Sequence, residues 1–220
     1  MHAPTHATTT VGLVDLRSRK CAAGQYEWCH GVQDCRLNSV QLHPTDPHLL
    51  ITAGGGATGA ICLHDMRKAG AAWKPLRTLD EHTKSINAAY VSPDGRYLVS
   101  VSQDNTIRTW ADFTAAKGEP SCAVTRHDNH TGRWLATLRP AFDPRHGSAF
   151  VLGSMDRPRR IEVFIPSSSS PTSSSSSVSV SLAAVLQGDH MGSVCSRNVF
   201  HPSLDVIVGC NSSGRVHIFR

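Results

Sequence analysis

The sequence lacks a long apolar run, a secretion signal and a paired cysteine motif. No window of eighteen apolar residues exists, which excludes a typical membrane-spanning helix. The first ten residues, MHAPTHATTT, have neither the basic start nor the apolar stretch of a secretion signal. These absences, together with an ordinary composition of 40% apolar and 18% charged residues, predict an intracellular globular chain of one or two domains.

The seven cysteines are scattered, odd in number and never arranged as a CxxC pair. This pattern argues against both a disulfide framework and a zinc ribbon. The segment 21–35 holds three cysteines and one histidine, but their spacing is not that of common metal ligands. We therefore expect reduced thiols, no metal site and no cofactor.

A repeat of about fifty residues runs through the chain, and such a period indicates a repeat architecture. A short extended run that ends in a turn proline occurs four times, and each is followed by two further apolar runs separated by a polar or glycine-rich turn. An aromatic-type residue near the end of each unit recurs at intervals of 46, 54 and 55 residues. These positions are His64, Trp110, Phe164 and Phe219. The short runs are rich in β-branched residues and predict antiparallel strands.

The unit EHTKSINAAYVSPDGRYLVSVSQDNTIRTW closely resembles the WD40 repeat. That resemblance implies a buried hydrogen-bond chain inside the blade, which would satisfy polar groups that are costly to bury. Its members are His82, Ser100, Asp104 and Trp110. A catalytic role for the Ser, His and Asp is the alternative, but no nucleophile-elbow sequence accompanies them.

We therefore predict an all-β fold, a partial WD40 β-propeller within residues 1–220. Four blades are expected at 34–79, 80–125, 126–187 and 188–220, after the end of an incomplete blade at 11–33. Since closed WD40 rings commonly have about seven blades, the sequence predicts the C-terminal part of one propeller. The serine-rich stretch 167–177 is expected to form a disordered loop.

Positive charge is concentrated between Arg126 and Arg160, a stretch that contains seven arginines and three aspartates. In a WD40 blade, the loop before the first strand and the loop between the second and third strands open on one rim. Clustered cations with an aromatic side chain suit nucleic acid, whose phosphates bind arginine and whose bases stack on aromatic rings. The alternative is that Trp134 packs into its blade and the arginines pair with local aspartates. The rim candidates are Lys84, Gln103, Arg126, Arg133, Trp134, Arg157, Arg159 and Arg160.

Three further stretches resemble the family of WD-repeat protein 76 and the fungal changed-mutation-rate protein. They are DNHTGRWLATLRPAFDP, FVLGSMDRPRRIEVF, and GSVCSRNVFHP with VGCNSSGRVHIF. The resemblance implies a nuclear protein that binds damaged DNA and has no enzymatic activity. A more distant likeness, to the small subunit of the damaged-DNA-binding heterodimer, places a DNA-inserting hairpin at Gly132, Arg133 and Trp134. It also places Gln103 and Arg139 near the DNA backbone, although the hairpin sequence differs from that relative's.

The same distant relative docks onto the adaptor of a cullin-RING ubiquitin ligase through a WDxR motif. Here LHDMR keeps Asp65 and Arg67 but has His64 in place of the tryptophan, and LVDLR at 13–17 is a second match. The alternative is purely structural, because Asp and Arg are common at blade ends. The competing functional hypothesis is therefore a chromatin or ubiquitin-ligase adaptor that recognises histones or another protein. Catalysis is the weakest hypothesis, since AGGGATG opens no helix and forms no nucleotide cradle.

Overall fold

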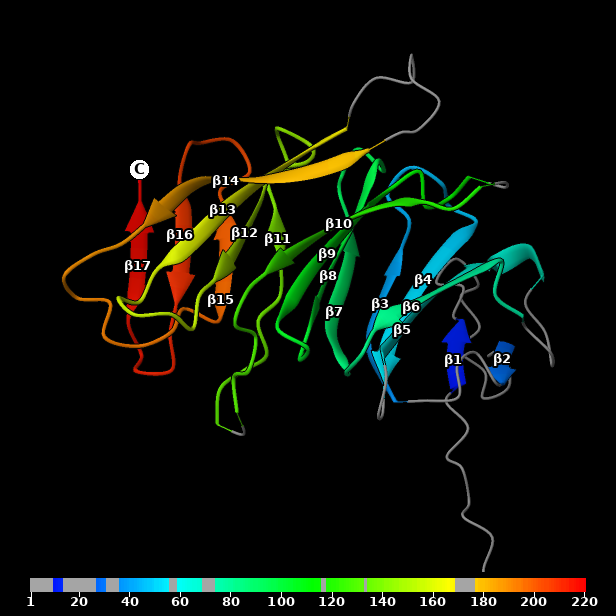
Figure 1. The fold of residues 1–220 in the computed structure, drawn as a ribbon, viewed down its shortest axis with the longest axis horizontal. Coiled ribbons are helices and arrows are strands. Elements are labelled where there is room, and N and C mark those ends of the chain that lie inside the picture. The colour runs from blue at the N-terminus through cyan, green and yellow to red at the C-terminus, as the bar shows by residue number, and fades with distance from the viewer. Residues whose placement is uncertain are drawn as a thin grey trace, which may run out of the picture.

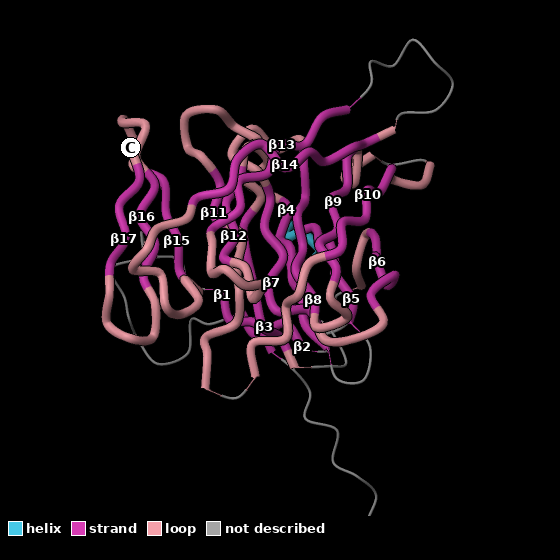
Figure 2. The backbone as a smooth tube through the Cα atoms, turned by 60° about the vertical axis from the view of Figure 1, so that its left-hand side comes forward, coloured by secondary structure: helices cyan, strands magenta, loops and turns pink. Residues whose placement is uncertain are grey.

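Antiparallel sheets stand side by side in chain order, like successive blades (Figure 1). The computed structural model describes residues 10–13, 27–30, 36–55, 59–68, 74–115, 118–132, 134–168 and 177–220. The expected incomplete blade at 11–33 contributes β1 (Thr10–Leu13) and β2 (Glu27–His30), and its other residues lie outside those ranges. Figure 2 shows the described elements almost entirely as strands. The described residues contain one helical turn, η1 (Met66–Lys68), and no helix long and apolar enough to cross a membrane.

Four sheets follow β1 and β2 along the described part of the chain. The first consists of β3 (Leu37–Leu42), β4 (Leu49–Gly55), β5 (Gly59–Asp65) and β6 (Arg77–His82). The second consists of β7 (Ile86–Val91), β8 (Tyr97–Ser102), β9 (Thr106–Ala111) and β10 (Ser121–Arg126). The third consists of β11 (Ala141–Phe142), β12 (Phe150–Gly153), β13 (Ile161–Ser168) and β14 (Val178–Leu186). The fourth consists of β15 (Arg197–Phe200), β16 (Ile207–Cys210) and β17 (Val216–Phe219).

The strand register confirms the repeat that the sequence predicts. In each sheet, the aromatic-type residue of the third strand pairs with a residue at or next to the start of the second strand. These pairs are Leu50 with His64, Leu98 with Trp110, Phe150 with Phe164 and Ile207 with Phe219. Each turn proline lies two residues beyond the first strand, where its missing N–H removes no ladder bond.

Apolar side chains fill three interfaces, each between two consecutive sheets. Alternate residues of a strand point to opposite faces, so one strand serves two interfaces. In β8, Leu98 packs toward the β3–β6 sheet, whereas Val99 and Val101 pack toward the β11–β14 sheet. In β12, Val151 belongs to the next interface, against the β15–β17 sheet. The sheets are thus held together face to face by their cores.

The hairpin of β13 and β14 is longer than its neighbours. Ser167 and Ser168, expected to begin the serine-rich loop, are the last residues of β13 and pair with Ser179 and Val178. Residues 169–176 of that expected loop lie outside the described ranges. The Ser168 hydroxyl accepts hydrogen bonds from Tyr97 Oη at 3.2 Å and Arg96 Nη2 at 3.3 Å, and both donors belong to or adjoin the neighbouring sheet.

Candidate nucleic-acid interface

Four segments form one edge of the sheets, which we call the rim: residues 83–85, 103–105, 127–139 and 154–160. Backbone hydrogen bonds join the first three segments. Gln103 N donates to Ser85 O at 3.0 Å, and His127 N donates to Asn105 O at 3.1 Å. The side chain of Asn129 continues this contact, since its Nδ2 donates to Thr106 O at 3.0 Å. In Figure 1 the chain between β10 and β11 protrudes from the lower edge of the molecule.

Trp134 is exposed on this rim, with 89% of its surface accessible. The side chain follows Gly132, whose φ of 67° belongs to the left-handed region that glycine favours. Leu135 and Leu138 anchor the segment in the core between β7–β10 and β11–β14. The indole therefore does not pack into its blade, contrary to the structural alternative from the sequence. Arg133, beside it, lies outside the described residues.

The three arginines of the turn between β12 and β13 have different surroundings. Arg157 is exposed and forms no ion pair with a described residue. Arg159 donates from Nη1 to the carbonyl oxygen of Met155. Arg160 forms two ion pairs of 2.6 Å, with Asp156 and Glu162, and these raise its pKa, Glu162 contributing most. Arg160 is thus paired with neighbouring carboxylates, as in the alternative that the sequence left open.

Gln103 and Arg139 lie close to each other in the structure. Trp134 is not among the residues around them. Both line a cavity of about 390 Å³, whose other walls come from β3, β7 and the segments beside them. Gln103 Nε2 donates to Asn87 Oδ1 at 3.4 Å, and Arg139 Nη1 donates to Tyr90 Oη at 3.3 Å. Lys84 is exposed on the rim, and its backbone carbonyl accepts a hydrogen bond from Ser102 Oγ at 3.1 Å.

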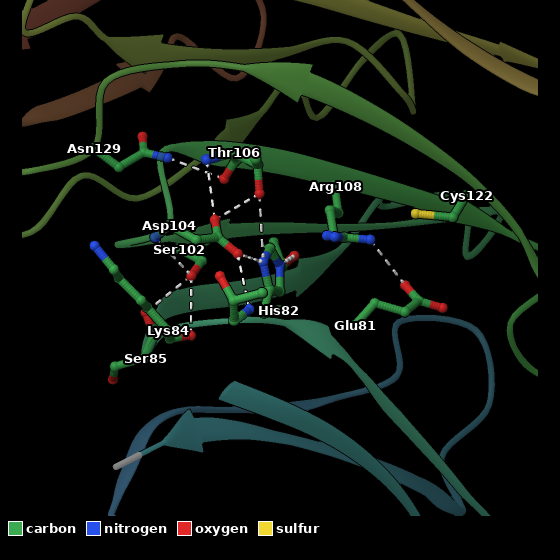
Figure 3. Close-up of polar contacts among 12 residues, drawn as sticks. Glu81, His82, Lys84, Ser85, Ser102, Asp104, Thr106, Arg108, Cys122 and Asn129 are labelled. Atoms are coloured by element: carbon green, nitrogen blue, oxygen red, sulfur yellow. Dashed lines mark hydrogen bonds and ion pairs between the residues drawn. The ribbon is translucent and has the colours of Figure 1, made fainter. Parts of the chain in front are cut away.

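The expected buried hydrogen-bond chain exists in the β7–β10 blade, with one change. His82 Nδ1 lies 2.8 Å from Asp104 Oδ2, and His82 Nε2 lies 2.6 Å from Ser100 Oγ. Figure 3 shows Thr106 joining this group through Asp104, whose Oδ1 accepts from Thr106 Oγ1 at 2.6 Å. Trp110 is not a member: its indole N–H donates to Glu81 Oε2 at 3.0 Å, and its ring meets His82 edge-on. The Ser100 hydroxyl contacts His82 instead, at 2.6 Å.

Burial lowers the pKa of His82, although the hydrogen bond with Asp104 acts in the opposite direction. Burial also acts to raise the pKa of Asp104, but hydrogen bonds from Thr106 and His82 outweigh it and lower that pKa overall. Neutral His82 therefore donates a hydrogen bond from Nδ1 to the Asp104 carboxylate and accepts one at Nε2 from the Ser100 hydroxyl. Ser100 is fully buried, so its hydroxyl cannot reach a substrate, and the three groups have a structural role.

Asp65 and Arg67 form a tight pair at the end of β5. Arg67 Nε and Nη2 each donate to a different oxygen of Asp65 at 2.9 Å, which is a bidentate arrangement. The hydrogen bond from Arg67 lowers the pKa of Asp65 to about 2. The Arg67 side chain remains 65% exposed, so the pair presents a fixed guanidinium at the surface. The second match, LVDLR, extends from β1 beyond the described residues.

The side chains of the cysteine-containing segment 21–35 lie outside the described residues. Elsewhere in the described chain, no three His, Cys, Asp or Glu side chains come together as a metal site would require. Sequence reasoning missed Arg36, Asn38, Ser85 and Asn87, which line the cavity with Gln103 and Arg139. The available signal was Asn87, a lone amide inside the apolar run INAAYV.

Comparison with known proteins adds to this geometry. The family model described as "WD domain, G-beta repeat" matches residues 73–111, which include the His82, Ser100 and Asp104 chain. The crystal structure of Sqt1 from Chaetomium thermophilum has a TM-score of 0.61 at 22% identity and covers 84% of this chain and 43% of its own. The described strands thus form part of a WD40 β-propeller, as the sequence predicts.

Two relatives match most of the chain. WD repeat-containing protein 76 of Xenopus laevis is 35% identical over 217 residues, which are 98% of this chain and 34% of the relative. DNA damage-binding protein CMR1 of Chaetomium globosum is 29% identical and covers 94% of this chain and 39% of its own length. The chain spans about a third of the length of the WD repeat-containing protein 76 relatives that it matches. The chain thus contains a segment that matches the WD repeat, and it is similar over nearly its whole length to WD repeat-containing protein 76 and, at lower identity, to the fungal CMR1 proteins.

Proposed function

We propose that this chain is part of a nuclear protein that binds DNA through its rim, with a preference for damaged DNA. The fungal relatives are named DNA damage-binding proteins, which supports a role in the damage response. The protein acts by binding, without catalysis. The single observation that carries the proposal is the exposed indole of Trp134 on an edge that also bears exposed Arg157 and Lys84.

Each of these side chains has a separate task in the proposed complex. The cations contact backbone phosphates and provide affinity that does not depend on base sequence. The indole stacks on a base or inserts at a base step that damage has weakened, where unstacking costs least. Arg133 would add a further cation beside Trp134. Arg160 is left out of the contact set because Glu162 and Asp156 hold it.

The test is fluorescence anisotropy of the full chain with undamaged and ultraviolet-damaged duplexes at two salt concentrations. We expect Trp134→Ala to abolish the preference for the damaged duplex. Arg157→Ala should weaken binding to both duplexes and reduce the slope of log K against log salt by about one. The matched control is Leu204→Ala, an exposed apolar residue in the turn between β15 and β16. Salt-independent binding, or an unchanged preference in Trp134→Ala, contradicts the proposal.

A second candidate function rests on Arg67, whose exposed guanidinium is fixed by Asp65. A fixed guanidinium suits a protein contact, because little side-chain entropy is lost on binding. We propose the adaptor of a cullin-RING ligase as this partner, with histones as the alternative protein ligand. Pull-down of the adaptor by the full chain should be lost in Arg67→Ala and retained in Arg157→Ala. Equal capture by both variants rejects the contact.

A further inference from the structure

The cavity of about 390 Å³ lies between three of the rim segments and the start of β3, and it draws its walls from three consecutive sheets. Arg36, Leu37 and Asn38 come from the start of β3 and the residue before it. Ser85, Asn87 and Gln103 come from the β7–β10 blade, and Thr137 and Arg139 from the segment that leads to β11. Its size falls within the range of pockets that hold small molecules or single side chains.

The walls are tied together by hydrogen bonds between neighbouring sheets. Asn38 Nδ2 donates to Ile86 O at 2.7 Å, and Ala89 N donates to Ser39 Oγ at 3.0 Å. Farther along, Val91 N donates to Gln41 Oε1 at 2.6 Å. Because these bonds fix β3 against β7, the cavity is formed before any ligand arrives, which reduces the entropic cost of binding.

Two residues of the cavity wall each have a buried hydrogen-bond donor with no partner among the described residues. Asn87 is only 2% exposed; its Oδ1 accepts from Gln103, but its Nδ2 has no acceptor. Arg139 donates from Nη1 to Tyr90, but its buried Nε has no acceptor. Buried polar groups in native proteins are nearly always paired. Both unpaired atoms donate, so the group that satisfies them must carry acceptor oxygens.

The charge of the lining points the same way. Two arginines, Arg36 and Arg139, line the cavity, and no Asp or Glu is among its described lining residues. Amides and a hydroxyl complete the polar part of the wall, through Asn38, Asn87, Gln103 and Ser85. Guanidinium and amide donors together suit an oxyanion, with which they form short, strong hydrogen bonds.

We propose that this cavity binds a carboxylate presented by an acidic segment of a protein partner, an Asp or Glu side chain. A carboxylate at the end of one or two methylene groups is small enough for a cavity of this size, and the guanidinium and amide groups of Arg139 and Gln103 can donate hydrogen bonds to it. The proposal assigns these two residues to a protein ligand rather than to DNA. This proposal does not depend on DNA binding by the rim.

The experiment uses the full chain and two fluorescein-labelled octapeptides, one of alternating Gly and Glu and its twin with Gln in place of Glu. We expect anisotropy at constant ionic strength to show at least tenfold tighter binding of the Glu peptide. Arg139→Met should weaken that binding about tenfold to one hundredfold, because a hydrogen bond to a charged group is lost. Gln103→Ala, at an exposed position, should weaken it two- to fivefold.

Arg157→Met is the matched control, since it removes the same charge from the rim outside the cavity lining. It should change peptide binding less than twofold. The proposal is overturned if the two peptides bind equally, if neither binds, or if Arg139→Met and Arg157→Met cause equal losses. Thermal unfolding of each variant checks that it is folded. If Arg139→Met does not fold, Gln103→Ala still decides the test.

An undamaged duplex measured against the same variants separates the two functions. We expect Arg157→Met to weaken duplex binding and Arg139→Met to leave it within twofold. If Arg139→Met weakens the duplex as much as the peptide, the cavity holds a phosphate and the carboxylate proposal is wrong. Failure of the rim proposal has a different signature, which is unchanged duplex binding in both Arg157→Met and Trp134→Ala.

Discussion

The second and third sheets bury the same kind of histidine but pair it in different ways. In β7–β10, His82 contacts Asp104 from the turn between β8 and β9 and packs edge-on against Trp110. In β11–β14, His127 also packs edge-on against the aromatic residue of the third strand, Phe164, at 6.2 Å. Its Nδ1 lies 2.7 Å from Asn129 Oδ1, and its Nε2 lies 3.4 Å from Glu162 Oε2.

The two carboxylates are then satisfied by different partners. Asp104 accepts from hydroxyl, imidazole and backbone N–H groups, all of them neutral (Figure 3). Glu162 instead pairs with Arg160, which reaches outward to Asp156. In both blades the buried histidine and carboxylate are paired, but different residues complete the pairing. The family model, which matches residues 73–111, covers the first arrangement and not the second.

The largest effect on stability is expected from Asp104→Ala. It removes the acceptor for His82, for the Thr106 hydroxyl and for the backbone N–H groups of Thr83 and Thr106. The free energy of unfolding should fall by about 3 kcal/mol, because buried donors lose their partner. Urea unfolding measures this loss, with Asp104→Asn as the milder control. A loss smaller than that of Glu162→Ala would reverse the comparison.

Acidification extends the comparison to the β3–β6 blade, where fully buried His64 occupies the position of Trp110. Burial lowers the pKa of His64 to about 4, below its ordinary value of 6.5. The contribution of neutral, buried His64 to the free energy of unfolding is therefore complete above pH 6.5. It is lost as the pH falls toward 4, since His64 is protonated in the unfolded chain first. After allowance for solvent screening, we expect a loss of about 2 kcal/mol.

His64→Phe removes this contribution and should make the dependence less steep between pH 7 and 4, while His82, whose pKa is also lowered by burial, keeps its share. Phenylalanine suits the site because two other blades have it at the matching position. Exposed His130→Phe is the control and should keep the slope of the unmodified chain. Urea unfolding at several pH values measures both. An equally steep dependence in His64→Phe would show that other groups cause it.

Glu162→Ala tests the third sheet and should cost about 1.5 kcal/mol, less than Asp104→Ala. The reason is that Arg160 keeps its 2.6 Å contact with Asp156 and is partly exposed, so its charge is not stranded. The double variant Glu162→Ala with Arg160→Met should lose little more than the single variant. A cost above 3 kcal/mol would mean that the arginine pair is as important as the chain around Asp104.

Ser100→Ala has the smallest expected effect, about 1 kcal/mol, since a single buried hydrogen bond of 2.6 Å to His82 is lost. Exposed Ser203→Ala should change the free energy of unfolding by less than about 0.5 kcal/mol. Chemical denaturation of both variants checks the difference. Equal values for the two would mean that the hydroxyl adds nothing to the His82 and Asp104 pair.

The repeat and its strands were predictable because they depend on local patterns. Short apolar runs, the turn prolines and the aromatic positions lie close together in the chain and mark each blade. The roles of His82, Ser100 and Asp104 followed from the resemblance of one unit to the WD40 repeat. The partner of Trp110 did not, because Glu81 is not part of that pattern.

The cavity and the state of the arginines were not predictable from local patterns. Asn87, Arg36 and Arg139 are separated by some fifty residues along the chain and meet only because three sheets stand side by side. The pairing of arginines with local acidic residues remained an open alternative in the sequence. The structure shows it for Arg160 and not for Arg157, a difference that depends on Glu162 facing the turn from β13.

The long β13–β14 hairpin also has a mechanical consequence. Neighbouring blades are joined mainly through their faces, so a pulling force would peel one from the next. The hairpin crosses this boundary at the outer perimeter, where Ser168 contacts Tyr97 and Arg96 and where β14 lies against β9 and β10. The hairpin thus connects the second and third sheets. Under a pulling force, we expect those two sheets to unfold together in a single event.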